Sequence, residues 1–212
     1  MSEPIQTLPL WIELAAMMTT AVYGGAEVRS RNVPIYGTLL SGLLMGVGGG
    51  MTRDILLGLE PAAMTDWFYI PAVLAAAVLG ATVLYKILSR QLPNLVIDGI
   101  AFGLLITVGA KKAMDHGAPF SSIILCGILT ASAGGMIVDM LTRHRAAVVS
   151  QAHWFASALL VGTLSFWVID TYVGFYYGVI ASVIIVTTLR VFSVTRNWPS
   201  PKWPGESEDM NA

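Results

Sequence analysis

The chain has 212 residues, of which 55% are hydrophobic and 12% charged, and its formal net charge is -1. Soluble domains carry about 25% charged residues, so this composition excludes an ordinary soluble domain. The balanced charge, without any basic run, also argues against a nucleic-acid partner.

Apolar runs account for most of the chain. A helix needs roughly 20 apolar residues to cross the hydrocarbon core of a bilayer. Seven runs qualify, at about 8–26, 35–57, 68–88, 93–110, 119–141, 150–169 and 174–194. The sequence therefore predicts an all-α membrane protein with seven transmembrane helices in a lipid bilayer.

The basic residues are distributed unevenly over the predicted loops. Of the 12 lysines and arginines, all but Arg53, Lys111 and Lys112 fall on the side that also holds the C-terminus. Because basic residues are enriched in cytoplasmic loops, this pattern predicts a cytoplasmic C-terminus and an N-terminus outside.

An internal repeat appears when the sequence is shifted by 85 residues. Ten identities then fall without a gap between residues 24 and 56 and the shifted copy, including Pro34 with Pro119 and Asp54 with Asp139. Each copy holds three predicted spans, and an odd number predicts inverted orientation in the membrane. We therefore expect a first repeat at 1–92, a second, inverted repeat at 93–172, a seventh helix at 173–196 and a disordered cytoplasmic tail at 197–212.

Glycine clusters in the second and fifth spans each precede an aspartate. They are Gly48, Gly49 and Gly50 before Asp54, and Gly134 and Gly135 before Asp139. Such glycines either allow close helix packing or interrupt a helix whose freed carbonyls face an ion path. Their symmetric recurrence favours interruption, so we expect leucine at Gly50 or Gly135 to disturb the protein more than leucine at Gly80.

The charges near these glycines have two interpretations each. Asp54 and Asp139 either concentrate cations at the two mouths of a path or pair locally, with Arg53 and Arg143 respectively. Lys111 and Lys112 either gate the outer mouth by pairing with Asp54 or snorkel to the interface. Lys112 corresponds to Glu27 under the repeat shift. Glu13 and Asp98 also correspond, and they are either interfacial or line vestibules.

Signatures of catalysis or cofactor binding are not recognisable in the sequence. The three histidines have no metal-ligand spacing, and neither a phosphate-binding loop nor a nucleophile with a plausible base is found. We therefore expect no enzyme activity, cofactor or resident metal.

Three motifs resemble the prokaryotic trimeric intracellular cation (TRIC) channel family. The stretch 48–58 resembles that family's GGGxxRDxLLG motif, and 109–113 resembles its GAxKA segment. The stretch 134–139 is similar to a second GGGxxRD motif, but Ala133 replaces its first glycine and Val138 its arginine. The resemblance implies seven transmembrane helices, a homotrimer in a bacterial or archaeal plasma (inner) membrane, and a potassium-permeable pore in each protomer, bounded by glycine-kinked helices 2 and 5.

The leading hypothesis is thus a passive channel for potassium or sodium ions. The alternatives are a small-solute, glycine-like secondary transporter that rocks about the same glycine hinges, and a membrane scaffold without transport activity. The residues expected along the ion path are Gly48, Gly49, Gly50, Thr52, Asp54, Thr130, Ser132, Gly134, Gly135 and Asp139. Those expected to supply gating or mouth charge are Arg53, Lys111, Lys112 and Glu27.

Overall fold

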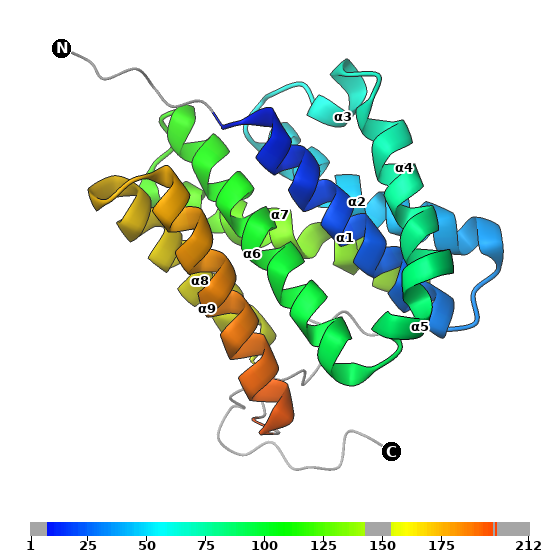
Figure 1. Ribbon diagram of the computed structural model, residues 1–212. Coiled ribbons are helices and arrows are strands. Elements are labelled where there is room, and N and C mark those ends of the chain that lie inside the picture. Colours follow the sequence, from blue (N-terminus) through cyan, green and yellow to red (C-terminus); the bar gives the residue numbers. More distant parts are fainter. Residues whose placement is uncertain (1–7, 143–153, 197, 199–212) are drawn as a thin grey trace, which may run out of the picture.

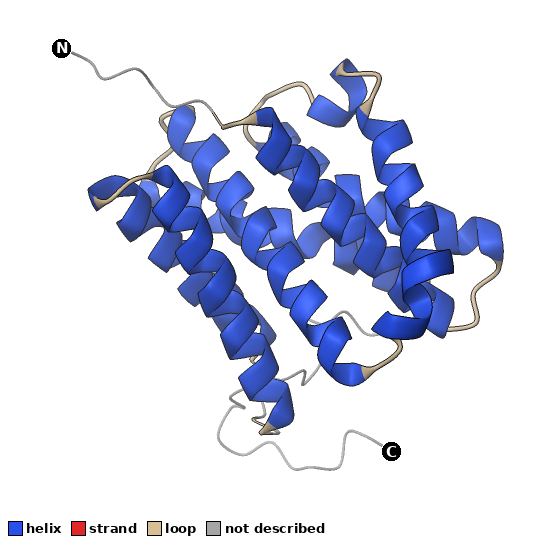
Figure 2. Ribbon diagram, viewed as in Figure 1, coloured by secondary structure: helices blue, strands red, loops and turns tan. Residues whose placement is uncertain are grey.

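The protein is a bundle of helices in a computed structural model that describes residues 8–142, 154–196 and 198. The ordered elements are α1 (Leu10–Ser30), α2 (Ile35–Leu56), α3 (Ala62–Thr65), α4 (Tyr69–Leu79), the π-helix η1 (Gly80–Leu84), α5 (Tyr85–Leu88), α6 (Gln91–Asp115), α7 (Phe120–Leu141), α8 (Phe155–Tyr172) and α9 (Phe175–Thr195). These described residues contain helices and loops but no strand (Figure 2). Apart from Trp198, the predicted tail at 197–212 lies outside them, as does Arg143.

Six helical segments are long and apolar enough to cross a membrane, namely α2, α4–α5, α6, α7, α8 and α9. They coincide with predicted runs to within a few residues, which confirms an all-helical membrane protein. The remaining long helix, α1, has 21 residues but carries Glu13, Glu27 and Arg29, and it falls outside this set.

Two helix pairs form the centre of the bundle. Helices α1 and α6 lie side by side across the middle of Figure 1, and α2 and α7 pack on each other behind them. Helix α4 packs against α1, whereas α9 packs against α6 and α8. Charged groups that are far apart in the sequence therefore meet on the central helices.

Helices α2 and α7 begin in the same way. Pro34 and Pro119 occupy their N-cap positions, with φ of -56° and -64°, and each helix then runs for 22 residues. Proline's fixed φ suits this position, and its missing N–H would have no partner in the first turn. Asp54 and Asp139 lie in the last turn of their helices, where the chain is about to leave the bundle.

The expected interruptions at the glycine clusters are not found. Residues 35–56 and 120–141 are each one unbroken α-helix, so the glycine-cluster carbonyls are not freed by a break. The glycines instead let the two helices approach closely. A Cβ at Gly49 would overlap the backbone oxygen of Thr130, and one at Gly134 would lie 2.6 Å from the oxygen of Met45. Tight packing, the simpler interpretation of these glycines, is therefore the correct one.

The space around the glycines does not follow the ranking expected for their leucine variants. A Cβ at Gly135 would meet only Met45 Cε at 3.7 Å, an ordinary contact, whereas one at Gly80 would overlap the backbone oxygen of Val22. Gly80 begins the π-helix η1, where Arg29 donates a hydrogen bond to the carbonyl of Ala81. The third span thus holds the irregular helical segment, and Gly80 is a close-packing position that the repeat comparison missed.

Candidate functional site

Four charged side chains meet where α1, α2 and α6 come together, and with Tyr69 they form what we call the Asp54 cluster. Arg53 is 0% exposed, and its guanidinium donates to Asp54 Oδ1 and to Glu13 Oε1, each at 2.8 Å. Lys112 Nζ lies 3.0 Å from Asp54 Oδ1 and 3.6 Å from Glu13 Oε1. Two cations thus balance two carboxylates, the condition under which buried charge is tolerated.

Neutral hydrogen-bond donors complete the Asp54 cluster. The hydroxyl of Tyr69 donates to Glu13 Oε2 at 3.3 Å, and the backbone N–H of Ala62 donates to Asp54 Oδ2 at 3.2 Å. Asp54 therefore holds the start of α3 against the end of α2. The sequence left the role of Glu13 open, and the structure assigns it to this buried network.

Lys111 turns away from the Asp54 cluster. Its Nζ lies 3.3 Å from Asp115 Oδ1 and 3.4 Å from Asp170 Oδ2, and 5.6 Å from the centre of the Phe175 ring. Adjacent helix positions point about 100° apart, so the two lysines serve different partners. Lys112 is the one that faces Asp54.

A second group of charges, the Asp139 cluster, consists of Glu27, Arg31 and Asp139. Arg31 Nη1 lies 2.8 Å from Asp139 Oδ1, and Arg31 Nη2 lies 3.6 Å from Glu27 Oε1. Glu13 and Glu27 are 14 positions apart on α1, which at 1.5 Å per residue places the two clusters about 21 Å apart along that helix.

The two clusters differ in charge balance. Among the described residues, the Asp54 cluster holds two carboxylates and two cations, whereas the Asp139 cluster holds two carboxylates and one guanidinium. Val138, which stands where the first motif has Arg53, supplies no charge. The two mouths predicted from the sequence would therefore have different electrostatics, as the exchange of Lys112 for Glu27 had indicated.

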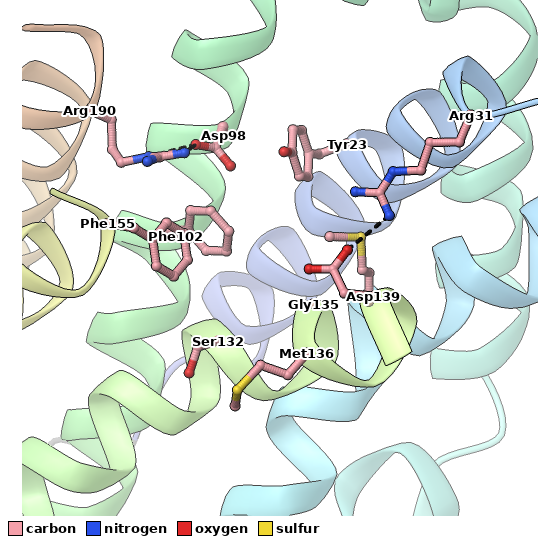
Figure 3. Close-up of a pocket in the computed structure, with 11 residues that line it drawn as sticks. Tyr23, Arg31, Asp98, Phe102, Ser132, Gly135, Met136, Asp139, Phe155 and Arg190 are labelled. Atoms are coloured by element: carbon pink, nitrogen blue, oxygen red, sulfur yellow. Dashed lines mark hydrogen bonds and ion pairs between the residues drawn. The ribbon is translucent and has the colours of Figure 1, made fainter. Parts of the chain in front are cut away.

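A cavity of about 60 Å³ opens beside Asp139, between α1, α6 and α7 (Figure 3). It is lined by Tyr23, Arg31, Met45, Asp98, Phe102, Ser132, Gly135, Met136, Asp139, Phe155 and Arg190. Asp98 is 1% exposed, and Arg190 donates to its Oδ2 through Nε at 2.8 Å and Nη2 at 2.6 Å. Arg190 comes from α9, so this ion pair ties α9 to α6.

Six of the predicted path residues lie at the helix contact or at the cavity. Ser132, Gly135 and Asp139 line the cavity, whereas Gly48, Gly49 and Gly134 lie where α2 and α7 cross. The hydroxyls of Thr52, Thr130 and Ser132 donate to backbone oxygens four residues earlier, at 2.8, 2.6 and 2.8 Å. That these residues line an ion path remains a prediction.

Sequence reasoning did not pair the residues that hold the charges in place. Arg31 and Arg190 entered only as loop charges, but each binds a buried carboxylate 108 or 92 positions away. One signal was available: Glu13 and Asp98 correspond in the repeat, and Glu13 binds Arg53, whose counterpart is the uncharged Val138. A missing arginine partner for Asp98 could therefore have been sought elsewhere in the chain.

This all-helical bundle with ion pairs between its helices defines a polytopic membrane protein. A family model described as "Glycine transporter" matches residues 10–85 and 95–171, well over half of the chain. The protein belongs to this family.

Curated relatives are similar over most of their length. The UPF0126 membrane protein YvgT of Bacillus subtilis is 26% identical over 90% of this chain and 94% of its own. The UPF0126 inner membrane protein YadS of Escherichia coli is 25% identical over 73% of this chain and 75% of its own. Both are bacterial membrane proteins by name.

Solved structures of TRIC channels have the same fold. One, from work on conductance through TRIC cation channels, aligns with a TM-score of 0.78 and 22% identity over 93% of this chain and 98% of its own. The TRIC orthologue from Rhodobacter sphaeroides aligns with a TM-score of 0.76 and 23% identity over 89% of this chain and 97% of its own. The resemblance drawn from the motifs is thus confirmed at the level of the fold.

Proposed function

We propose that this protein is a passive channel for monovalent cations, with potassium as the main permeant ion and a pore through each protomer. The observation that carries the proposal is the placement of Asp54 and Asp139 at the far ends of the packed helices α2 and α7. Carboxylates at two mouths concentrate cations and disfavour anions. The fold shared with TRIC cation channels supports the same conclusion.

In this proposal the ion path runs along α2 and α7 from Asp54 to the cavity at Asp139, and the glycines packed at the helix contact border the path without lining it. Because neither helix is interrupted, the glycines act as close-packing and hinge positions rather than as sources of free carbonyls. The Asp139 cluster has one more carboxylate than cations and attracts cations. At the other end, Lys112 covers Asp54, so entry there requires Lys112 to move.

The proposed membrane topology has seven spans, with α1 as the first, arranged as two inverted three-helix repeats and an added seventh helix. Two matches of one family model, starting at residues 10 and 95, begin 85 positions apart (95 − 10), the same interval as the sequence repeat. The domain boundaries proposed from the sequence at 92/93, 172/173 and 196/197 follow from this arrangement.

We further propose a homotrimer in a bacterial inner membrane, with the N-terminus outside and the C-terminus cytoplasmic. Lysine and arginine placement supports the orientation, and the TRIC channels of the same fold, described as trimeric, support the assembly. Crosslinking in membranes should give a ladder that ends at the trimer; a ladder that stops at the dimer contradicts this assembly.

A second candidate is a small-solute secondary transporter, and the description of the family as glycine transporters favours it. The two halves would rock about the glycine contact between α2 and α7. The solved structures of the same fold are described as channels, which fits a protein that is not an enzyme but favours conduction over carriage.

A flux assay in liposomes separates the two functions. Vesicles containing the protein should release potassium down its gradient at a rate that rises with potassium concentration and is indifferent to glycine. Saturable glycine uptake, with no potassium flux in its absence, contradicts the channel. Vesicles with the Asp54→Asn/Asp139→Asn double variant serve as the matched control and should lose most of the flux.

A further inference from the structure

Asp98 has one carboxylate oxygen that no group in the described part of the chain satisfies. Arg190 donates two hydrogen bonds to Oδ2 of Asp98, whereas Oδ1 is buried without a partner among the described residues. A buried carboxylate oxygen is a strong acceptor, and leaving it unpaired is costly. A group outside the described residues is therefore expected to meet Oδ1.

This oxygen faces the cavity beside Asp139. In Figure 3 the carboxylate of Asp98 and the hydroxyl of Tyr23 point toward one another across the open space. The cavity volume of about 60 Å³ leaves room for one ion and a few waters, since about 10–15 Å³ of such volume holds one water.

The chemistry of the unpaired atoms selects the ligand. Of the four buried side-chain atoms without partners in the described residues, only Asp98 Oδ1 belongs to a cavity-lining residue, and it is an acceptor. A zwitterion such as glycine would also need a cationic partner for its own carboxylate, but both cavity arginines already bind Asp98 and Asp139. The site thus favours a ligand that is purely cationic.

We propose that Asp98 Oδ1 and the hydroxyl oxygen of Tyr23 hold a monovalent alkali-metal cation in this cavity. Carboxylate, hydroxyl and water oxygens are ligands that such hard cations prefer. The cavity's two carboxylates and two guanidiniums balance, and Glu27, 3.6 Å from Arg31 Nη2, adds negative charge next to it. The site deepens the proposed function and rests on it for the identity of the ion.

The direct test is a crystal of the full-length protein grown in thallium, which replaces potassium and scatters anomalously. We expect an anomalous peak in contact with Asp98 Oδ1. Density for water alone at this place, with thallium elsewhere or nowhere, overturns the proposal.

Variants test the same site in solution. A bound ion stabilises the folded protein, so the melting temperature should rise when potassium replaces choline at constant ionic strength. Gly135→Val fills the cavity from an open position, because its Cβ would meet only Met45 Cε at 3.7 Å. Gly135→Val should lower the apparent potassium affinity at least about tenfold. Asp98→Asn, if that variant folds, should lower the affinity by a similar factor. Asp170→Asn, which removes a buried carboxylate that does not line the cavity, is the matched control and should leave the affinity unchanged. Equal potassium responses in Gly135→Val and the wild type contradict the proposal.

The outcomes separate the site from the channel. Potassium currents without thallium at Asp98 would remove the site and leave the proposed function standing. Thallium at Asp98 in a protein that carries no current would keep the site and remove the channel.

Discussion

Lys112 Nζ lies 3.0 Å from Asp54 Oδ1, whereas the neighbouring Lys111 points to Asp115 and Asp170. The two lysines look alike in the sequence, and their different partners give them different expected roles. Lys112 neutralises the carboxylate at one predicted mouth. Lys111 ties α6 to α8 at a place outside the Asp54 cluster.

Lys112→Gln should therefore raise potassium conductance and flatten its voltage dependence. Without Lys112, Asp54 and Glu13 keep only Arg53 as a cationic partner, so the mouth becomes negative. A full charge crossing the membrane gains about 2.3 kcal/mol per 100 mV, and a partial movement proportionally less. Current–voltage curves from planar bilayers measure the change. Lys111→Gln is the adjacent control, and a larger effect from Lys111→Gln would refute the assignment.

Changes in the Asp139 cluster should act in opposite directions. Asp139→Asn removes a carboxylate and should lower conductance, whereas Arg31→Gln leaves two carboxylates without their guanidinium and should raise it. A unit charge near the mouth is worth about 0.5–1 kcal/mol, or about two- to fivefold in local cation concentration. The effects should be largest at low salt, where screening is weakest. If both variants change conductance in the same direction, the cluster does not act through its charge.

Glycine substitutions should rank by the space around each Cβ. Gly49→Ala and Gly134→Ala force apart the backbones of α2 and α7, and Gly80→Ala does the same to α1 and η1. Overpacking of this kind costs about 1–3 kcal/mol or more. Gly135→Ala meets only one methyl group and should be tolerated. Melting temperatures in detergent test the ranking, and equal losses in all four variants would disprove it.

The buried Arg53 should be more important for stability than for conduction. Arg53→Met leaves Asp54 and Glu13 with only Lys112, and breaking a buried ion pair in this way costs about 3–5 kcal/mol. Adding Glu13→Gln to Arg53→Met removes one of the uncompensated charges and should recover part of the lost stability. Melting temperatures of the single and double variants give the coupling between the residues. Additive losses would mean that Arg53 and Glu13 do not interact.

The helices were largely predictable, because membrane thickness fixes their length and proline marks the starts of α2 and α7. The glycine contacts were not predictable from the sequence, because a glycine run such as 48–50 fits both an interrupted helix and a close crossing of two helices. Only the partner, here the backbone of Thr130, decides between them. The Asp98–Arg190 pair was hidden for a similar reason: 92 positions separate the residues, and α9 has no counterpart in the repeat.

Single-channel recording of the purified wild-type protein in planar bilayers tests the cation channel most directly. With potassium chloride at different concentrations on the two sides, we expect unitary current steps whose reversal potential lies near that of potassium. Replacing potassium by choline should abolish the steps, and adding glycine should leave them unchanged. Saturable glycine transport by the same preparation, without unitary steps in potassium, would contradict a cation channel.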